Sequence, residues 1–458
     1  MAIDGSTTLY SRQTSISLLA SIEAAMANVL FFFVAFVVLL FLHPHVQGSR
    51  LSLTHVDSVA QLTSAERFRR AARRSHSRRQ AFEGKWSSPS TVVAAVDYAG
   101  DFEYVIDFGI GSPVLPATAI LDTGSDLIWT QCVPCLDCLS QPSPYYDPSK
   151  SYTFSPVPCS SPFCSNRSLT DIGCGGDRCL YLASYGDGTE STGFLGTETF
   201  IFGDGSSIAG VTFGCGFQNN GSLSNSTGIV GMGRGPLSLP SQLNPRKFSY
   251  CLTPLDSSAA SHLFLGSTAS LEGNRGTLIG STPLISSPHT YFSTFYYLSL
   301  LGISLGGTRL PIPESVFQLK RDGSGGTIID SGTFLTLLNQ AGYDILREEI
   351  IKQVRKPAAE LPEVIQDLGI DLCFSFHGAS SLPPMPELVF HFEGADMRFP
   401  RDKYMAYVDE LGLLCSVIVG TQSFSFSIFG NYQQQDMHIL FDLEANVLSF
   451  VPANCNQL

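Results

Sequence analysis

The sequence predicts an all-β protein whose two halves repeat one another. Its 458 residues exceed an ordinary domain in length, and 44% apolar residues suffice to build two sizeable cores. The 42 glycines, 26 prolines and 32 phenylalanines, with few long stretches of helical periodicity, favour strands joined by turns. Each half also contains the same short motif, in which an apolar run ends in an aspartate.

The motif reads TAILDTGS around Asp122 and GTIIDSGT around Asp330. Both copies are typical of a strand that delivers a carboxylate into a tight turn, where a glycine lets the backbone bend. Each aspartate is followed, much later in the chain, by two apolar residues and a glycine, at 229–231 and 428–430. The pattern indicates a duplication, and it predicts that the two carboxylates form one dyad.

A carboxylate dyad supplies an acid and a base together. Two carboxylates a few ångström apart cannot both ionise cheaply, so such a pair shares one proton over an acidic range. The ionised member can take a proton from a water held between them, and the protonated member can donate to a peptide carbonyl oxygen. This chemistry requires no covalent intermediate, metal or cofactor.

Residues 93–458 resemble a pepsin-type aspartic endopeptidase of the plant nepenthesin-like branch. The resemblance rests on the two Asp motifs, the two glycine segments, YGDG at Tyr185–Gly188 and a cysteine-rich insert. It implies a two-lobed pepsin-like fold with a catalytic cleft between an N-terminal lobe at 93–285 and a C-terminal lobe at 286–458. It also implies a monomer that cleaves proteins or peptides in acid and is inhibited by pepstatin-type compounds.

The resemblance assigns roles to the neighbours of the catalytic Asp122 and Asp330. The first hydroxyl residue after each aspartate would brace the two turns against each other, and the second would hydrogen-bond the outer carboxylate oxygen. The dyad-supporting residues are Thr123, Gly124, Ser125, Ser331, Gly332 and Thr333.

A mobile flap is implied at Tyr185 and Gly186, where a glycine-containing hairpin would close over bound substrate. Trp129, seven residues after the first aspartate, would support the flap tyrosine. Without the resemblance, a tryptophan here would be interpreted as part of the core.

The N-terminal segment 1–48 contains a nearly unbroken apolar run of nineteen residues, AAMANVLFFFVAFVVLLFL at 24–42. Such a run fits either a secretory signal peptide or an uncleaved signal anchor. We favour the signal peptide, because the cysteines downstream need an oxidising compartment. A start at Met26 would give a signal of usual length and make residues 1–25 an extension.

Residues 49–92 are polar and arginine-rich, with RFRRAARRSHSRR at 67–79. Residues 1–92 hold ten Lys and Arg and five Asp and Glu, which gives a net charge of +5. The remainder of the chain holds 17 Lys and Arg and 35 Asp and Glu, which gives a net charge of −18. A flexible linker or a nucleic-acid-binding arm would explain such a run. The resemblance favours a propeptide that lies across the acidic cleft, held by charge and released as carboxylates take up protons.

All twelve cysteines lie downstream of the apolar run, seven of them within 132–179. An even count after a signal peptide predicts six disulfides. The CxxCxxC run at 132–138 could otherwise bind zinc or an iron–sulfur cluster, but metal thiolates belong to reducing compartments and no histidine lies at ligand spacing. By resemblance the expected pairs are Cys132–Cys135, Cys138–Cys215, Cys159–Cys179, Cys164–Cys174, Cys251–Cys455 and Cys373–Cys415.

Three N-glycosylation sequons begin at Asn166, Asn220 and Asn225, in polar loops of the first half. They support passage through the secretory pathway, with the extracellular apoplast or cell wall favoured over the vacuole. A cleaved signal would leave no stable membrane anchor.

Beyond the first half, the Ser, Thr, Gly and Pro-rich stretch 252–290 is interpreted as the passage between lobes. The G-x-S-x-G match at 302–306 resembles a serine-hydrolase motif, but GGTRLPIP follows it where that motif needs a helix, so a strand is predicted. The clearest helix spans 340–356, with apolar residues at four-residue spacing and Pro357 to stop it.

Other enzyme classes fit the sequence poorly. HExxH, P-loop and GxGxxG motifs are absent, and the acidic body disfavours nucleic acid as a partner. The alternative is a catalytically silent binding or inhibitor protein of the same fold. A cysteine-rich cell-wall glycoprotein would explain the cysteines and sequons, but not the duplicated Asp motif.

Overall fold

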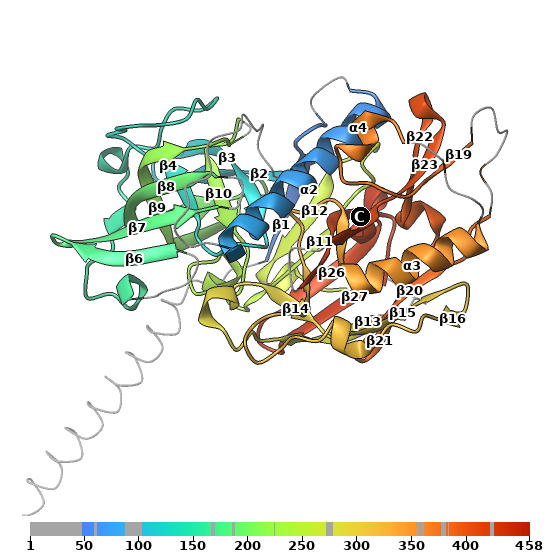
Figure 1. Ribbon diagram of the computed structural model, residues 1–458. Helices are drawn as coiled ribbons and strands as arrows, with labels where there is room; N and C mark the ends of the chain where they lie inside the picture. Colours follow the sequence, from blue (N-terminus) through green and yellow to red (C-terminus); the bar gives the residue numbers. More distant parts are fainter. Residues whose placement is uncertain are drawn as a thin grey trace, which may run out of the picture. The chain divides into compact units, whose positions relative to one another are not determined.

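The computed structural model describes residues 48–58, 62–87, 103–165, 170–185, 188–223, 225–271, 278–354, 358, 361–376, 382, 384–421 and 426–458. The apolar run at 24–42, Asn166 and Gly186 lie outside these residues. The described chain consists mainly of strands, which confirms the prediction of an all-β fold (Figure 1). None of the described helices is long and apolar enough to cross a membrane.

The first half of the described chain is built mainly from strands, with an α-helix between the first two. They are β1 (Ser49–His55), β2 (Tyr104–Ile110), β3 (Leu115–Asp122), β4 (Trp129–Gln131), β5 (Ser155–Pro156), β6 (Thr170–Gly175), β7 (Arg178–Ser184), β8 (Glu190–Ile201), β9 (Ser207–Asn220), β10 (Gly228–Gly231), β11 (Lys247–Cys251) and β12 (Ser261–Leu265).

The second half is also built mostly from strands. They are β13 (Gly280–Ile285), β14 (Tyr296–Leu298), β15 (Leu300–Leu305), β16 (Thr308–Arg309), β17 (Thr327–Ile329), β18 (Thr336–Asn339), β19 (Cys373–Ser375), β20 (Leu388–Phe392), β21 (Ala395–Phe399), β22 (Met405–Val408), β23 (Leu413–Ser416), β24 (Ile418–Thr421), β25 (Ser427–Phe429), β26 (Met437–Asp442) and β27 (Val447–Pro452). The α-helices of the described chain are α2 (Ser64–Ser87), α3 (Gln340–Gln353) and α4 (Glu363–Gln366).

The duplicated sequence pattern corresponds to a duplicated strand pairing. β3, which ends at Asp122, runs parallel to β10, with Gly231 opposite Asp122. In the second half, β17 runs parallel to β25, with Phe429 opposite Ile329 and Asp330 next in the chain. Each apolar-apolar-glycine segment therefore supports the strand that carries its own aspartate.

Strand pairing runs continuously from one half of the chain into the other. β11 pairs with β26, and β13 pairs with β27, both antiparallel. Phe248 and Phe441 stack at this junction with ring centroids 4.5 Å apart. The prediction of a passage at 252–290 was therefore too simple, because β12 and β13 lie within it and belong to the sheet.

Helix α3 begins where the sequence predicts and ends at Gln353, three residues before the predicted Lys356. The Asn339 side chain caps it by accepting a hydrogen bond from the Ala341 amide, and Leu346 and Ile350 are buried. Pro357 lies outside the described residues.

The basic segment folds as β1 and α2, which the sequence analysis did not predict. β1 lies between β2 and β12, pairs antiparallel with both, and buries Leu51 and Leu53. Thr63 and Glu66 cap α2 reciprocally, since the Glu66 amide donates to Thr63 Oγ1 and the Thr63 amide to Glu66 Oε2.

The twelve cysteines form six disulfides, as predicted. The expected pairs Cys251–Cys455 and Cys373–Cys415 are present. The other four expected pairs are wrong: the structure pairs Cys132–Cys215, Cys135–Cys138, Cys159–Cys174 and Cys164–Cys179.

The first of these corrections has a simple physical cause. Cys132 continues β4, which runs parallel to β9, and the Cys132 amide donates to the Gly216 carbonyl at 2.8 Å. Cys132 is thereby brought beside Cys215 in the buried core. Cys135 then pairs with Cys138 in the loop that follows.

Candidate active site

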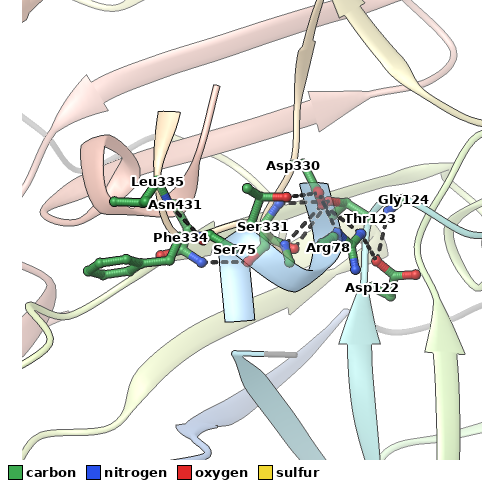
Figure 2. A network of polar contacts seen from close by, with 12 residues as sticks. Ser75, Arg78, Asp122, Thr123, Gly124, Asp330, Ser331, Phe334, Leu335 and Asn431 are labelled. Atoms are coloured by element: carbon green, nitrogen blue, oxygen red, sulfur yellow. Dashed lines mark hydrogen bonds and ion pairs between the residues drawn. The ribbon is translucent and has the colours of Figure 1, made fainter. Parts of the chain in front are cut away.

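Asp122 and Asp330 lie at corresponding places and face the same buried site (Figure 2). Both carboxylates are almost fully buried, with 2% and 1% of the residue exposed. The two turns are joined directly, because the Ser331 amide donates to Thr123 Oγ1 at 2.9 Å and the two hydroxyls lie 3.1 Å apart. This arrangement brings two carboxylates from distant parts of the chain close together, as a dyad would require.

Glycine backbone amides support both carboxylates. The Gly124 amide donates to Asp122 Oδ1 at 3.1 Å, and the Gly332 amide donates to Asp330 Oδ1 at 2.9 Å. The two turns therefore present the same donor at the same offset from the aspartate.

The second hydroxyl residues differ between the two turns. Thr333 Oγ1 donates to Asp330 Oδ2 at 2.6 Å. The expected equivalent bond from Ser125 is absent, since its buried hydroxyl has no hydrogen-bond partner among the residues that the structure describes. The repeated sequence pattern thus overstates the symmetry of the site.

Arg78 of α2 occupies the space between the two carboxylates. Its Nη2 lies 2.9 Å from Asp122 Oδ1, and its Nε lies 3.0 Å from Asp330 Oδ2. Only 8% of the arginine side chain is exposed. A Cβ at Gly124 would stand 2.6 Å from Arg78 Nη2, so the glycine gives the guanidinium room to approach.

A second group of charges joins the basic segment to the body of the protein. Arg74 Nη2 lies 2.7 Å from Glu103 Oε2, and its Nη1 lies 2.8 Å from Asp57 Oδ2. His55 Nε2 lies 2.9 Å from the same Glu103 oxygen. Burial by itself would raise the pKa of Glu103, but the Arg74 charge and the hydrogen bonds from His55 and Arg74 lower it to about 2.

Polar and apolar contacts fix the rest of α2. Ser75 Oγ accepts hydrogen bonds from the Phe334 and Leu335 amides at 2.8 and 2.9 Å, directly after the second Asp motif. The Phe68 ring packs edge-on against the Phe334 ring. The helix therefore covers the chain that leaves Asp330.

Tyr185 and Trp129, the predicted flap tyrosine and its predicted support, are in contact. Trp129 Nε1 donates to the Tyr185 hydroxyl at 2.8 Å. The Tyr185 amide donates to the Thr189 carbonyl at 2.8 Å. Gly186 itself lies outside the described residues.

The G-x-S-x-G match lies on β15, which confirms the prediction of a strand. Ser304 Oγ lies 2.7 Å from His391 Nε2, and His391 Nδ1 lies 2.6 Å from Asp396 Oδ1. A serine nucleophile needs a sharp, exposed turn and free amide donors. Ser304 is instead 7% exposed and held in a strand that is paired on both sides, so this network is structural.

Family models described as "Xylanase inhibitor N-terminal" and "Xylanase inhibitor C-terminal" match residues 104–267 and 295–452. Aspartic proteinase nepenthesin-1 of Nepenthes gracilis is 45% identical over 414 residues, covering 90% of this chain and 91% of its own. Aspartic proteinase nepenthesin-2 of the same plant is 41% identical over 411 residues, covering 89% and 90%.

Solved structures share the fold at low identity. The crystal structure of edgp matches with a TM-score of 0.61 and 20% identity, covering 77% of this chain and 92% of its own. Basic 7S globulin from soybean matches with a TM-score of 0.58 and 18% identity, covering 77% and 93%.

The fold and the similarities define an aspartic-type endopeptidase with a pepsin-like all-β architecture. Within that class, the chain belongs to the nepenthesin-like aspartic proteinases of plants.

Proposed function

We propose that the protein hydrolyses peptide bonds at acidic pH through the Asp122–Asp330 dyad. The observation that carries this proposal is the direct contact of the two turns through Thr123 and Ser331, which holds both carboxylates at one point. One carboxylate takes a proton from water, and the protonated partner donates to the substrate carbonyl oxygen as the water adds. The resulting tetrahedral intermediate then collapses as the leaving nitrogen gains a proton.

Tyr185 is the group that closes over an extended peptide in this mechanism. Its hydroxyl is oriented by the hydrogen bond from Trp129, so the ring is held at a defined position against Trp129. Trp129 is 1% exposed and rigidly packed, which makes it a firm support for a moving flap.

The protein is made as a zymogen in this proposal, with residues 49–92 as its propeptide. The contact of Arg78 with both carboxylates supports this view, because an occupied dyad can hold neither water nor substrate. A carboxylate that takes up a proton loses most of its attraction for a guanidinium, so acid weakens this contact.

The Arg74–Glu103 pair has a different response to acid. The folded pKa of Glu103, about 2, lies below the ordinary 4.5, so its contribution is fully present above about pH 4.5 and is lost progressively as the pH falls from there to about 2. The propeptide therefore keeps part of this anchor in mild acid.

Glu103→Gln should weaken this anchor, because Arg74 then keeps Asp57 as its charged partner but loses the buried Glu103 charge. We expect the full chain to melt at a lower temperature at about pH 5 than the wild type, and the difference to shrink towards about pH 2. Calorimetry across this pH range measures the difference in melting temperature and its change with pH. A difference in melting temperature that stays constant with pH would contradict the role of the Glu103 charge.

Passage through the secretory pathway follows from the disulfides, which form in oxidising compartments. Asn220 and Asn225 are both exposed and lie in sequons, so they are candidates for glycosylation. We propose a monomeric, secreted enzyme of the apoplast or cell wall, with the vacuole as the other destination.

The direct test is digestion of unfolded globin by the acid-treated protein from about pH 2.5 to about pH 7, with and without pepstatin. Cleavage limited to acid and abolished by pepstatin is the expected result. A folded protein that lacks its propeptide and cleaves nothing would instead support the silent binding or inhibitor protein.

A further inference from the structure

A third buried carboxyl group follows Asp122 closely in the chain and takes no part in the chemistry described above. Asp126 follows Asp122 by four residues, in the turn that carries the first catalytic aspartate, and only 3% of it is exposed. Its Oδ1 accepts hydrogen bonds from Thr294 Oγ1 at 2.6 Å and from the Gly235 amide at 2.8 Å. Its Oδ2 has no hydrogen-bond partner among the described residues.

Three glycines shape the pocket that holds the Asp126 side chain. A Cβ at Gly235 would stand 2.1 Å from Asp126 Oδ2, and one at Gly233 would stand 2.5 Å from Oδ1 and 2.3 Å from Thr294 Oγ1. At Gly231 a Cβ would meet the Asp126 backbone at 2.3 Å. The segment 231–235 is therefore packed around this carboxyl group with no room for side chains at these positions.

Thr294 connects this pocket to the second aspartate. It lies two residues before the start of β14, in which Tyr296 lies opposite Ile329 of β17, and Asp330 follows Ile329 in the chain. The Tyr296 hydroxyl donates to the Met232 and Gly233 carbonyls, and the Arg234 amide donates to the Thr294 carbonyl at 3.0 Å. The Asp126–Thr294 hydrogen bond thus joins the turn of Asp122 to the strands that position Asp330.

We propose that Asp126 is a positioning residue for the dyad: its protonated side chain joins the Asp122 turn to the Thr294 segment, and its ionisation weakens this joint. The inference rests on the proposed dyad mechanism. It concerns a residue that touches neither substrate nor water in that mechanism.

The charged and titratable groups around Asp126 explain why the neutral form fits. Asp122 is a like charge, and Tyr296 stays neutral because burial raises its pKa. The Arg234 guanidinium donates hydrogen bonds to Ile285 O and Asn446 Oδ1 at 2.7 and 2.9 Å, and these two acceptors fix its orientation. Burial raises the pKa of Asp126 and the Asp122 charge adds to this, against the hydrogen bonds from Thr294 and Gly235.

The sign of the pH effect follows from the raised pKa. A carboxyl group whose pKa is higher in the folded state stabilises the fold fully below its unfolded pKa of 3.8, and this stabilisation is lost as the pH rises through the folded pKa. An ionised Asp126 would keep two hydrogen bonds on Oδ1 but leave Oδ2 charged, buried and without a donor. The connection between Asp126 and Thr294 is therefore most stable in acid and weakens towards neutral pH.

The test uses Asp126→Asn, in which the amide oxygen can accept the same two hydrogen bonds and no charge can form. The acid-treated variant should keep kcat in acid within about twofold of the wild type and lose activity at a pH about one unit higher on the neutral side. Asp177→Asn, at an exposed hairpin turn, is the matched control and should follow the wild type. An Asp126→Asn profile identical to the wild type would overturn the proposal.

A second pair of variants tests the joint without changing the carboxyl group. Thr294→Val removes the hydroxyl at constant shape and should lower kcat about tenfold or more with KM changed less than about threefold, whereas Thr294→Ser should restore kcat. Equal kcat for the valine and serine variants would exclude a positioning role.

The melting temperature of the full latent chain separates this inference from the proposed function. From about pH 4 to about pH 7, the stability advantage of Asp126→Asn over the wild type should grow, whether or not the protein cleaves any substrate. An advantage that does not grow with pH would overturn the ionisation step. Absence of all proteolysis would instead reject the dyad function and leave this readout intact.

Discussion

Replacing either dyad carboxyl group should abolish proteolysis while the protein stays folded. In Asp122→Asn or Asp330→Asn the amide fills the same volume and can accept the same glycine amide bond, but it can neither take a proton from water nor donate one as an acid. We expect kcat for unfolded globin or a peptide to fall by about a thousandfold or more, because the one remaining carboxyl group cannot act as acid and base at the same time.

The two asparagine variants should differ in stability. Asp330 accepts hydrogen bonds from the Gly332 amide and from Thr333, whereas Asp122 accepts only the Gly124 amide bond among its own turn's described residues. In Asp330→Asn one of the two carboxylate oxygens becomes an NH2 group, so the hydrogen bond donated by Thr333 cannot be kept in its present form. This variant should therefore melt at a lower temperature than Asp122→Asn. Asp177→Asn again serves as the control, and residual activity of either dyad variant above about one per cent would contradict the mechanism.

The duplicated motif was sufficient to predict that Asp122 and Asp330 lie close together. An apolar strand followed by a glycine turn allows few arrangements of TAILDTGS and GTIIDSGT. The later apolar-apolar-glycine segments pair with the strands that carry the two aspartates. The inequality of the two turns could not be predicted, because Ser125 and Thr333 have the same chemistry in sequence. Packing alone decides which hydroxyl reaches its carboxylate.

The disulfides show a similar limit. The even cysteine count predicts six bonds, but pairing depends on which strands are neighbours in space. Cys174 and Cys179 lie opposite each other on β6 and β7, yet each bonds a cysteine of the preceding loop, Cys159 and Cys164. Sequence spacing contains no information of this kind.

The basic segment was recognised by charge, but its structure was missed. An arginine-rich stretch usually indicates a solvated face, yet Ala71, Arg74, Ser75 and Arg78 are all buried on α2. Their spacing of three and four residues places them on one helical face, and Thr63 with Glu66 is a capping box in the sequence. These two signals together could have predicted a helix whose buried face is polar because its partner site is acidic.

Arg78 should contribute most of the coupling between this helix and the dyad, and its removal should produce the second large effect. In Arg78→Leu, two buried carboxylates lose their shared cation, a change that typically costs about 3–5 kcal/mol for a buried pair. The helix is still held by Arg74 and Ser75, so the protein should fold. A loss of about 3 kcal/mol corresponds to about a hundredfold larger population with an open site.

The measurement is the rate at which the full chain converts to a pepstatin-sensitive, active form at about pH 5, where the wild type should convert slowly. Arg78→Lys keeps the charge but cannot bridge both carboxylates through a planar fork, so it should convert at an intermediate rate. Arg73→Leu removes an exposed arginine from the same helix and should match the wild type. If Arg78→Leu converted no faster than Arg73→Leu, the Arg78 contact would not be what keeps the dyad closed, and Arg74 with Glu103 would have to account for latency.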